Sequence, residues 1–250
     1  MDLVSIGELL IDFTPVAGAE ESYRAHPGGA PANVVCAAQV HGLKTAFIGA
    51  VGNDHFGELL KETLSDHGVD ISGIHSIDEA FTTLAFVSLD EEGERDFSFA
   101  RKPGADQLLE LGLAQRALLE KTRVLHYGTI SLSDEPARSA TREAVEIVKE
   151  AGGLVSFDPN LRPALWASSE ALLEQVRWGL AHCDILKISD DDLAQMDARP
   201  HEQVVEEYLK SYDLELVLLS QGARGASAYW LDSNAALQRV FASSAEGLKV

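Results

Sequence analysis

The stretch His26–Val35, "HPGGAPANVV", places two adjacent glycines and a proline beside a run of small residues that predicts the start of a helix. Glycine permits positive φ and lets a ligand approach the backbone closely. Asn33 offers a donor and an acceptor, the pairing that a sugar hydroxyl needs. These residues alone leave two interpretations open, a ligand-binding loop or a tight turn before a helix. They match neither a Walker A loop nor a GxGxxG pattern.

On both sides of this stretch, apolar runs typical of strands alternate with amphipathic runs typical of helices. The predicted strands are Leu3–Ile11, Thr45–Val51, Val124–Tyr127, Leu154–Phe157, Ile185–Ile188 and Leu216–Ser220. The predicted helices are Ala32–His41, Phe56–His67, Glu135–Ala151, Glu170–His182 and Glu202–Tyr212. This alternation predicts an α/β fold with a mostly parallel sheet. Asp54 and Ser133 are the expected N-caps of two of the helices.

One region interrupts the alternation. Residues Thr82–Arg101 read as two strands joined by a turn around Glu91–Gly93, which predicts a β-hairpin. A hairpin that projects from an α/β sheet is a candidate lid over the ligand edge. We expect one domain over residues 1–250, with lid strands around 13–25 and 81–101.

Composition excludes several classes of protein. Forty acidic against twenty basic residues give a net charge of −20, which disfavours nonspecific binding to nucleic acid or to an anionic membrane. No apolar run reaches the length of a membrane span. The two cysteines, Cys36 and Cys183, lie in apolar segments and fit a reducing, cytoplasmic location better than a disulfide framework. The scattered histidines disfavour a transition-metal site.

Polar residues follow the predicted strands at the edge where ligands bind in doubly wound sheets. Six segments should therefore meet at one rim: Asp12, residues 27–33, Gly128–Ser131, Asp158–Arg162, Lys187–Asp192 and Ser220–Gly225. Each also has a purely structural interpretation.

The alternatives differ from segment to segment. Asp12 could bind two hydroxyls or simply face solvent at a strand end. Arg162, in "FDPNLRP", could meet a phosphate or pair with Asp158. The acids Asp190–Asp192 could organise hydrated magnesium or oppose a helix dipole. The glycines of "LLSQGARGASAY" could hold phosphates or only join two strands.

Taken together, these motifs resemble the ribokinase-type, phosphofructokinase-B-like sugar kinases, most closely the fructokinase branch. The resemblance spans nearly the whole chain, in the family's order: "GELLIDF", "PGGAPANV", "AFIGAVGNDHFGELL", "GVDISGI", "TTLAFVSLDEEGERDFSF", "HYGTISLSDEP", "FDPNLRPALW", "DILKISDDDL" and "LVLLSQGARGA". It implies a ribokinase-like three-layer α/β sandwich with a small β lid, and transfer of phosphate from ATP with Mg²⁺ to a sugar hydroxyl. A monovalent cation such as K⁺ is an optional addition, and dimerisation through the lid is a frequent property of such enzymes.

The resemblance also implies roles for individual residues. The expected sugar-binding residues are Asp12, Gly28, Gly29, Asn33, Phe99, Arg101, Asp158 and Asn160. Arg162 matches a catalytic residue near the reacting end of the substrate. The expected nucleotide-binding residues are Lys187, Ser189, Ser220, Gly222 and Gly225. Asp192 is expected to bind magnesium through water.

The chain departs from the family pattern at three places. The motif Asn-x-x-Glu is replaced by Ser189-x-x-Asp192, and the tyrosine that often precedes the lid arginine is Ala100. The signature Asp-Thr-Thr-Gly-Ala-Gly-Asp, which supplies the general base and an anion hole, has no match before Val250. The resemblance thus implies a C-terminally truncated chain that is inactive by itself.

The first hypothesis is a fructokinase that makes fructose 6-phosphate. One rival is a 2-keto-3-deoxygluconate kinase, which shares "GGAPANV" and "DPNLR". Another is a non-catalytic sugar-binding relic of a kinase. An in-frame Gly-Ala-Gly-Asp in the coding DNA beyond codon 250 would favour truncation, and a native stop codon would favour the relic.

Overall fold

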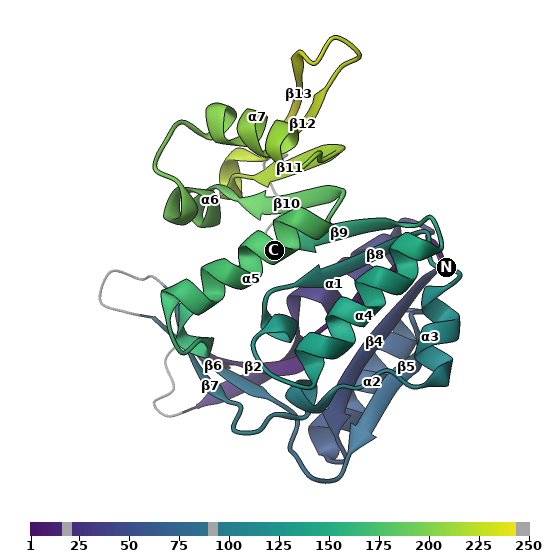
Figure 1. Ribbon diagram of the computed structural model, residues 1–250. Coiled ribbons are helices and arrows are strands. Elements are labelled where there is room, and N and C mark those ends of the chain that lie inside the picture. The colour runs from purple at the N-terminus through teal and green to yellow at the C-terminus, as the bar shows by residue number, and fades with distance from the viewer. Residues whose placement is uncertain (17–21, 90–94, 244–250) are drawn as a thin grey trace.

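A computed structural model describes residues 1–16, 22–89 and 95–243, and within these ranges the strands form two sheets (Figure 1). The main sheet has nine strands in the order β13-β12-β11-β10-β9-β8-β1-β4-β5. Their bounds, in that order, are Leu237–Ala242, Ala226–Leu231, Leu216–Ser220, Ile185–Ser189, Leu154–Asp158, Val124–Gly128, Leu3–Ile6, Thr45–Gly52 and Asp70–Ile77. All neighbours pair in parallel except β12 with β11 and β13, so the predicted mostly parallel sheet is confirmed.

The small sheet has four strands in the order β3-β2-β6-β7. Their bounds are Tyr23–Gly28, Leu10–Pro15, Leu84–Leu89 and Arg95–Ala100. The strands β6 and β7 form the predicted hairpin, whose turn lies outside the described residues.

Helices cover the main sheet on both faces (Figure 1). The α-helices are α1 (Ala30–Val40), α2 (His55–Asp66), α3 (Leu113–Leu119), α4 (Ala137–Glu150), α5 (Ser169–His182), α6 (Asp190–Met196) and α7 (His201–Ser211). Short 3₁₀ turns are η1 (Ala105–Leu108), η2 (Ile130–Leu132), η3 (Pro163–Leu165) and η4 (Gly222–Arg224). Five of these helices match the predicted ones to within two residues, because their apolar faces repeat with helical spacing.

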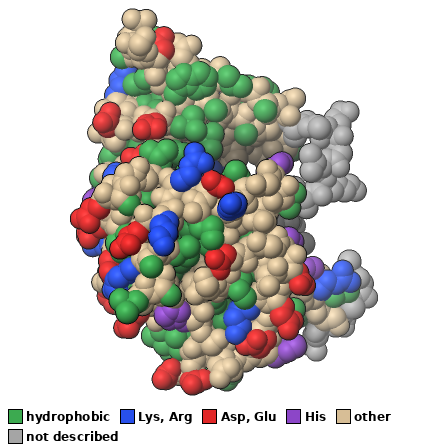
Figure 2. All heavy atoms as spheres, turned by 90° about the vertical axis from the view of Figure 1, so that its right-hand side faces the viewer, with side chains coloured by type: hydrophobic (Ala, Val, Ile, Leu, Met, Phe, Trp, Pro, Cys, Tyr) green, Lys and Arg blue, Asp and Glu red, His purple; other side chains and the backbone are tan. Residues whose placement is uncertain are grey.

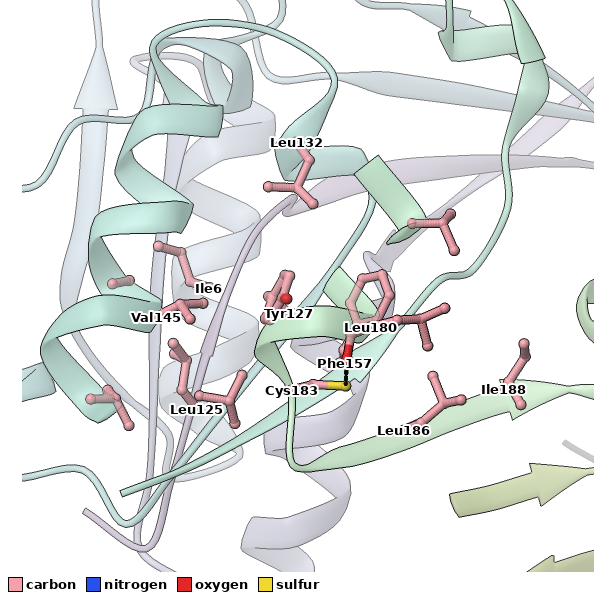
Figure 3. Close-up of a cluster of buried hydrophobic side chains, with 14 of the residues drawn as sticks. Ile6, Leu125, Tyr127, Leu132, Val145, Phe157, Leu180, Cys183, Leu186 and Ile188 are labelled. Carbon is pink, nitrogen blue, oxygen red and sulfur yellow. Dashed lines mark hydrogen bonds between the residues drawn. The ribbon is translucent and has the colours of Figure 1, made fainter. Parts of the chain in front are cut away.

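Alternation along the buried strands separates two hydrophobic cores. Leu3 and Phe47 point to the face that α1 and α2 cover. Val4 and Ile48 point to the opposite face, which α4, α5 and α7 cover. Figure 3 shows part of this second core, where Tyr127 and Phe157 pack with ring centroids 5.0 Å apart. Burial of these side chains holds the parallel strands in register and so fixes the strand ends that form the site.

Two local predictions were wrong. Leu3–Ile11 is not one strand, because the chain leaves the main sheet after Ile6 and enters the small sheet at Leu10. Asp12 therefore lies in the small sheet and not at the end of a main-sheet strand. Ser133 does not cap the next helix, since α4 begins at Ala137 and the Ser133 hydroxyl donates to the Ile130 carbonyl. The Asp54 cap is confirmed by its bond from the Gly57 amide at 2.9 Å.

On the face shown in Figure 2, acidic and basic side chains are interspersed, and hydrophobic side chains gather toward the C-terminal strands. Leu218, Val240 and Phe241 of these strands are among the exposed apolar residues. No helix in the described part of the chain is long and apolar enough to cross a membrane.

Candidate functional site

A cavity of about 320 Å³ lies where the carboxyl ends of the main-sheet strands face the small sheet. Its lining residues are Glu8, Leu10, Asp12, Gly29, Ala30, Asn33, Phe99, Ile130, Asp158, Asn160, Arg162 and Lys187. The structure thus brings together most of the predicted sugar-binding residues, together with the predicted catalytic Arg162 and one predicted nucleotide residue, Lys187.

The two glycines before α1 are required by close approaches of the chain to itself. Gly29 has φ of +119°, and a Cβ there would lie 2.5 Å from the Glu8 carbonyl oxygen. A Cβ on Gly28 would clash with the Asp12 carboxylate. Without these glycines the start of α1, which carries Asn33, could not sit against the Glu8–Asp12 segment. Gly28 itself lines a separate cavity of about 240 Å³, which Asn33 also lines.

The opposite side of the cavity holds an ion pair. Lys187 Nζ donates to Asp158 Oδ2 at 2.8 Å, while Asp158 Oδ1 is buried with no hydrogen-bond partner among the described residues. Burial raises the pKa of the Asp158 carboxyl, the nearby Asp192 carboxylate adds to this, and Lys187 opposes it. Lys187 lies in this cavity, beside Asp158, because β9 and β10 are neighbours in the sheet.

Asn160 and Arg162 follow Asp158 on the loop after β9. Asn160 has φ of +40°, a left-handed conformation that asparagine tolerates better than most residues. Arg162 Nη1 donates to the Leu161 carbonyl at 2.8 Å. This loop therefore presents an amide and a guanidinium to the cavity from a fixed backbone.

The predicted nucleotide residues lie farther along the same edge. Ser189 and Ser220 are register partners at the ends of β10 and β11. Ser189 also caps α6, accepting from the Asp192 amide at 3.0 Å. Gly222 has φ of +53° and open space where a Cβ would be, whereas a Cβ on Gly225 would clash with the Ala242 carbonyl. Gly225 therefore has a structural reason to be glycine, and Gly222 leaves room for a ligand.

Asp192 lies in the first turn of α6, only 8% exposed. Burial raises the pKa of its carboxyl, and Ser189 and Arg162 partly offset this. The described residues contain no group of three or more His, Cys, Asp or Glu side chains that could hold a metal ion. A carboxylate such as that of Asp192 is a ligand type that Mg²⁺ accepts, commonly together with water and phosphate oxygens.

Arg101 is held away from this cavity by buried partners. Its side chain is 4% exposed and pairs with Asp106 at 2.7 Å, and it donates to the Ser133 hydroxyl and the Ile130 carbonyl. It lines a second cavity of about 470 Å³ that shares Phe99 with the first. Of the two hairpin residues expected to cover a sugar, only Phe99 reaches the first cavity.

Sequence reasoning did not single out Glu8, which lines the cavity and is 2% exposed. It lies in the break between β1 and β2, inside the motif "GELLIDF". The available signal was a glutamate within an apolar run of eleven residues, because charged side chains are seldom fully buried.

Residues 1–245 match the pfkB family of carbohydrate kinases. The chain belongs to this family. It is 42% identical to probable fructokinase-5 of Arabidopsis thaliana over 235 residues, covering 91% of this chain and 72% of the relative. It is 41% identical to fructokinase-2 of Solanum lycopersicum, covering 91% and 71%.

Solved structures agree with this assignment. The fructokinase of Vibrio cholerae O395, crystallised with fructose, ADP and calcium ion, is similar with a TM-score of 0.83 and 33% identity. The similarity covers 98% of this chain and 78% of that one. The ribokinase-like fold that the motifs implied is therefore confirmed, and this chain is a sugar-kinase family member.

Proposed function

We propose that this pfkB-family protein is of the fructokinase type and serves the transfer of the γ-phosphoryl group of ATP to the C6 hydroxyl of fructose. The observation that carries the proposal is a single cavity lined by Asp12 and Asn33 and also by Arg162 and Lys187. Carboxylate and amide groups form hydrogen bonds with hydroxyls, and cationic side chains form charge-assisted hydrogen bonds with phosphate oxygens. Fructose and ADP, bound in the V. cholerae fructokinase, are the matching ligands.

In this proposal the residues that line the cavity have different tasks. Asp12 and Asn33 would accept from and donate to the hydroxyls of the sugar ring and so fix its orientation. Arg162 would meet the negative charge that develops at the reacting end. Because phosphoryl transfer depends mainly on positioning and charge neutralisation, such groups supply much of the catalysis.

The nucleotide side of the proposal rests on the edge formed by β10 and β11. Ser189, Ser220 and Gly222 would hold ATP there, and Asp192 would hold Mg²⁺ through water. When bound, Mg²⁺ neutralises phosphate oxygens. The structures of V. cholerae fructokinase were determined with bound calcium ion and with bound potassium ion, which supports a metal ion as part of the proposed function, with K⁺ as an optional second one.

We extend the proposal to assembly and location. Tyr23 and Phe86 of the small sheet are 50% and 36% exposed and pack edge to face at 5.9 Å, which supports a homodimer through this sheet, acting as the lid. The free cysteines Cys36 and Cys183, both with thiol pKa raised by burial, support the reducing cytoplasm.

No segment of the 250 residues matches the family signature that carries the catalytic aspartate. We therefore propose that a polypeptide of these residues binds sugar without phosphorylating it. A general base contributes about 10²–10⁴-fold in rate, and oxyanion-type donors contribute about 10²–10³-fold. Loss of both would leave turnover below the limit of a coupled assay.

The experiment compares the 250-residue polypeptide with a form extended by any in-frame downstream coding sequence. Coupled assays with ATP use fructose and 2-keto-3-deoxygluconate in parallel, and Asp12→Ala serves as the site control. Turnover of fructose by the extended form, abolished by Asp12→Ala, is expected. Turnover of the keto acid alone would favour the kinase rival, and no turnover with sugar binding retained would favour the non-catalytic relic.

A further inference from the structure

Glu8 is a buried carboxyl in the wall of the sugar cavity that the roles above do not use. It lies in the three residues that carry the chain from β1 of the main sheet to β2 of the small sheet. Both sheets and the start of α1 meet at this point, so Glu8 borders Asp12, Gly29 and Asn33 along the cavity.

The two oxygens of Glu8 have different surroundings. Oε1 accepts from the Ala30 amide, the first residue of α1, at 3.2 Å. Oε2 is buried and has no hydrogen-bond partner among the described residues. A buried polar atom without a partner destabilises the protein, because it has lost its bonds to water. A ligand hydroxyl in the adjoining cavity is a partner that would remove this destabilisation.

The charged groups near Glu8 come from several elements. Asp106 on η1 and Arg101 after β7 lie on one side of it and affect its pKa in opposite directions. Asp12 on β2 lines the same cavity, and Asp158 and Lys187 line its far side. Burial raises the pKa of Glu8 to about 7, so the carboxyl keeps its proton in mildly acidic solution.

We propose that Glu8 is a sugar-binding residue whose protonated Oε2 donates a hydrogen bond to a hydroxyl oxygen of the bound sugar. Oε1 meanwhile holds the start of α1 and so positions Asn33. The neighbouring carboxylates of Asp12 and Asp158 are acceptors, and a protonated Glu8 adds the donor that a neutral polyol needs. This inference rests on the proposed sugar-kinase function and adds a residue that selects neutral sugars.

The test is isothermal titration calorimetry of fructose into the 250-residue protein and its variants at pH 6 and pH 8.5. Glu8→Gln keeps a donor and an acceptor, and Glu8→Ala removes both. Glu110→Gln makes the same change at an exposed glutamate and is the matched control. Thermal melts without sugar report whether each variant is folded.

We expect Glu8→Ala to weaken fructose binding about tenfold at pH 6, the effect of one hydrogen bond. Glu8→Gln and Glu110→Gln should stay within about threefold of the unsubstituted protein. The fructose affinity of the unsubstituted protein, divided by that of Glu8→Gln, should be lower at pH 8.5 than at pH 6. The reason is that ionised Glu8 has no proton to donate.

Three results would overturn the inference. Equal affinity of the folded Glu8→Ala variant and the unsubstituted protein would show that Glu8 does not contact the sugar. If the fructose affinity of the unsubstituted protein, compared with that of Glu8→Gln, rose with pH, Glu8 would be a hydrogen-bond acceptor and not a donor. If Glu8→Ala does not fold, the pH dependence of fructose binding by the unsubstituted protein, compared with that of Glu8→Gln, still tests the inference. Absence of fructose binding by the unsubstituted protein would overturn both this inference and the proposed function.

Discussion

The substitution Asp106→Ala should destabilise the fold more than any surface change, because Asp106 joins both ends of the β6–β7 hairpin. Its Oδ1 accepts from the hydroxyl of Thr83, just before β6, at 2.5 Å. Its Oδ2 accepts from Arg101 Nε, just after β7, at 2.8 Å. The side chains of Arg101 and Asp106 are 4% and 2% exposed, so water cannot replace these bonds.

The magnitude follows from the charge that remains. Asp106→Ala leaves the Arg101 guanidinium buried, with Asp134 at 3.3 Å as its remaining carboxylate. Breaking a buried ion pair by removing one partner costs about 3–5 kcal/mol. For a chain of this size such a loss lowers the melting temperature by about 10 °C. Asp106→Asn should cost less, since an amide oxygen can still accept from one of the two donors.

Urea unfolding followed by circular dichroism measures the effect. Glu206→Ala is the control, because it removes an exposed ion pair to Lys210 of 2.6 Å and should change the unfolding free energy by about 0.5 kcal/mol or less. A loss below about 1 kcal/mol for Asp106→Ala would contradict this prediction, since it would mean that water reaches Arg101 in the folded state.

Two further predictions concern the residues around the cavity. Glu8→Gln should flatten the pH dependence of stability: the pKa of Glu8 rises from 4.5 to about 7 on folding, so stability is lost as pH rises from about 4.5 to 7. At 1.36 kcal/mol per pH unit this is about 3 kcal/mol, and in urea unfolding the stability of the unsubstituted protein relative to that of Glu8→Gln should fall by about this amount between pH 5 and pH 8. Gly29→Ala should lower the free energy of unfolding by several kcal/mol, because the new Cβ would meet the Glu8 carbonyl oxygen. The control is Gly42→Ala, where φ is +84° but the space is open, and its loss should be about 1–2 kcal/mol. Thermal melts of both variants measure the difference. Equal losses at the two glycines would contradict the close approach.

The sequence predicted those features that depend on local pattern. The parallel strands and five helices follow from apolar spacing, and Asp54 caps α2 because its side chain lies next to the first free amides of that helix. The chemistry of the rim was also predictable, because Asp158 ends a strand and Asn160 and Arg162 come shortly after it. Their roles in binding stay predictions.

The break at residues 7–9 was not predictable from pattern, since "LVSIGELLIDF" is apolar on both sides of it. Which half joins which sheet depends on partners far along the chain: β1 pairs with β4 and β8, and β2 pairs with β3 and β6. The prediction that Ser133 caps a helix was wrong for a similar reason. Arg138 donates to the carbonyls of Leu132 and Ser133, and α4 begins only at Ala137.

Residue type and short-range spacing were enough to predict the α/β alternation, five of the helices and the polar residues at the strand ends. In contrast, the ion pair that keeps Arg101 out of the cavity and the place of Glu8 in the cavity wall both depend on long-range packing. The burial of a charged side chain depends on which distant segments pack against it, and no local pattern encodes those contacts.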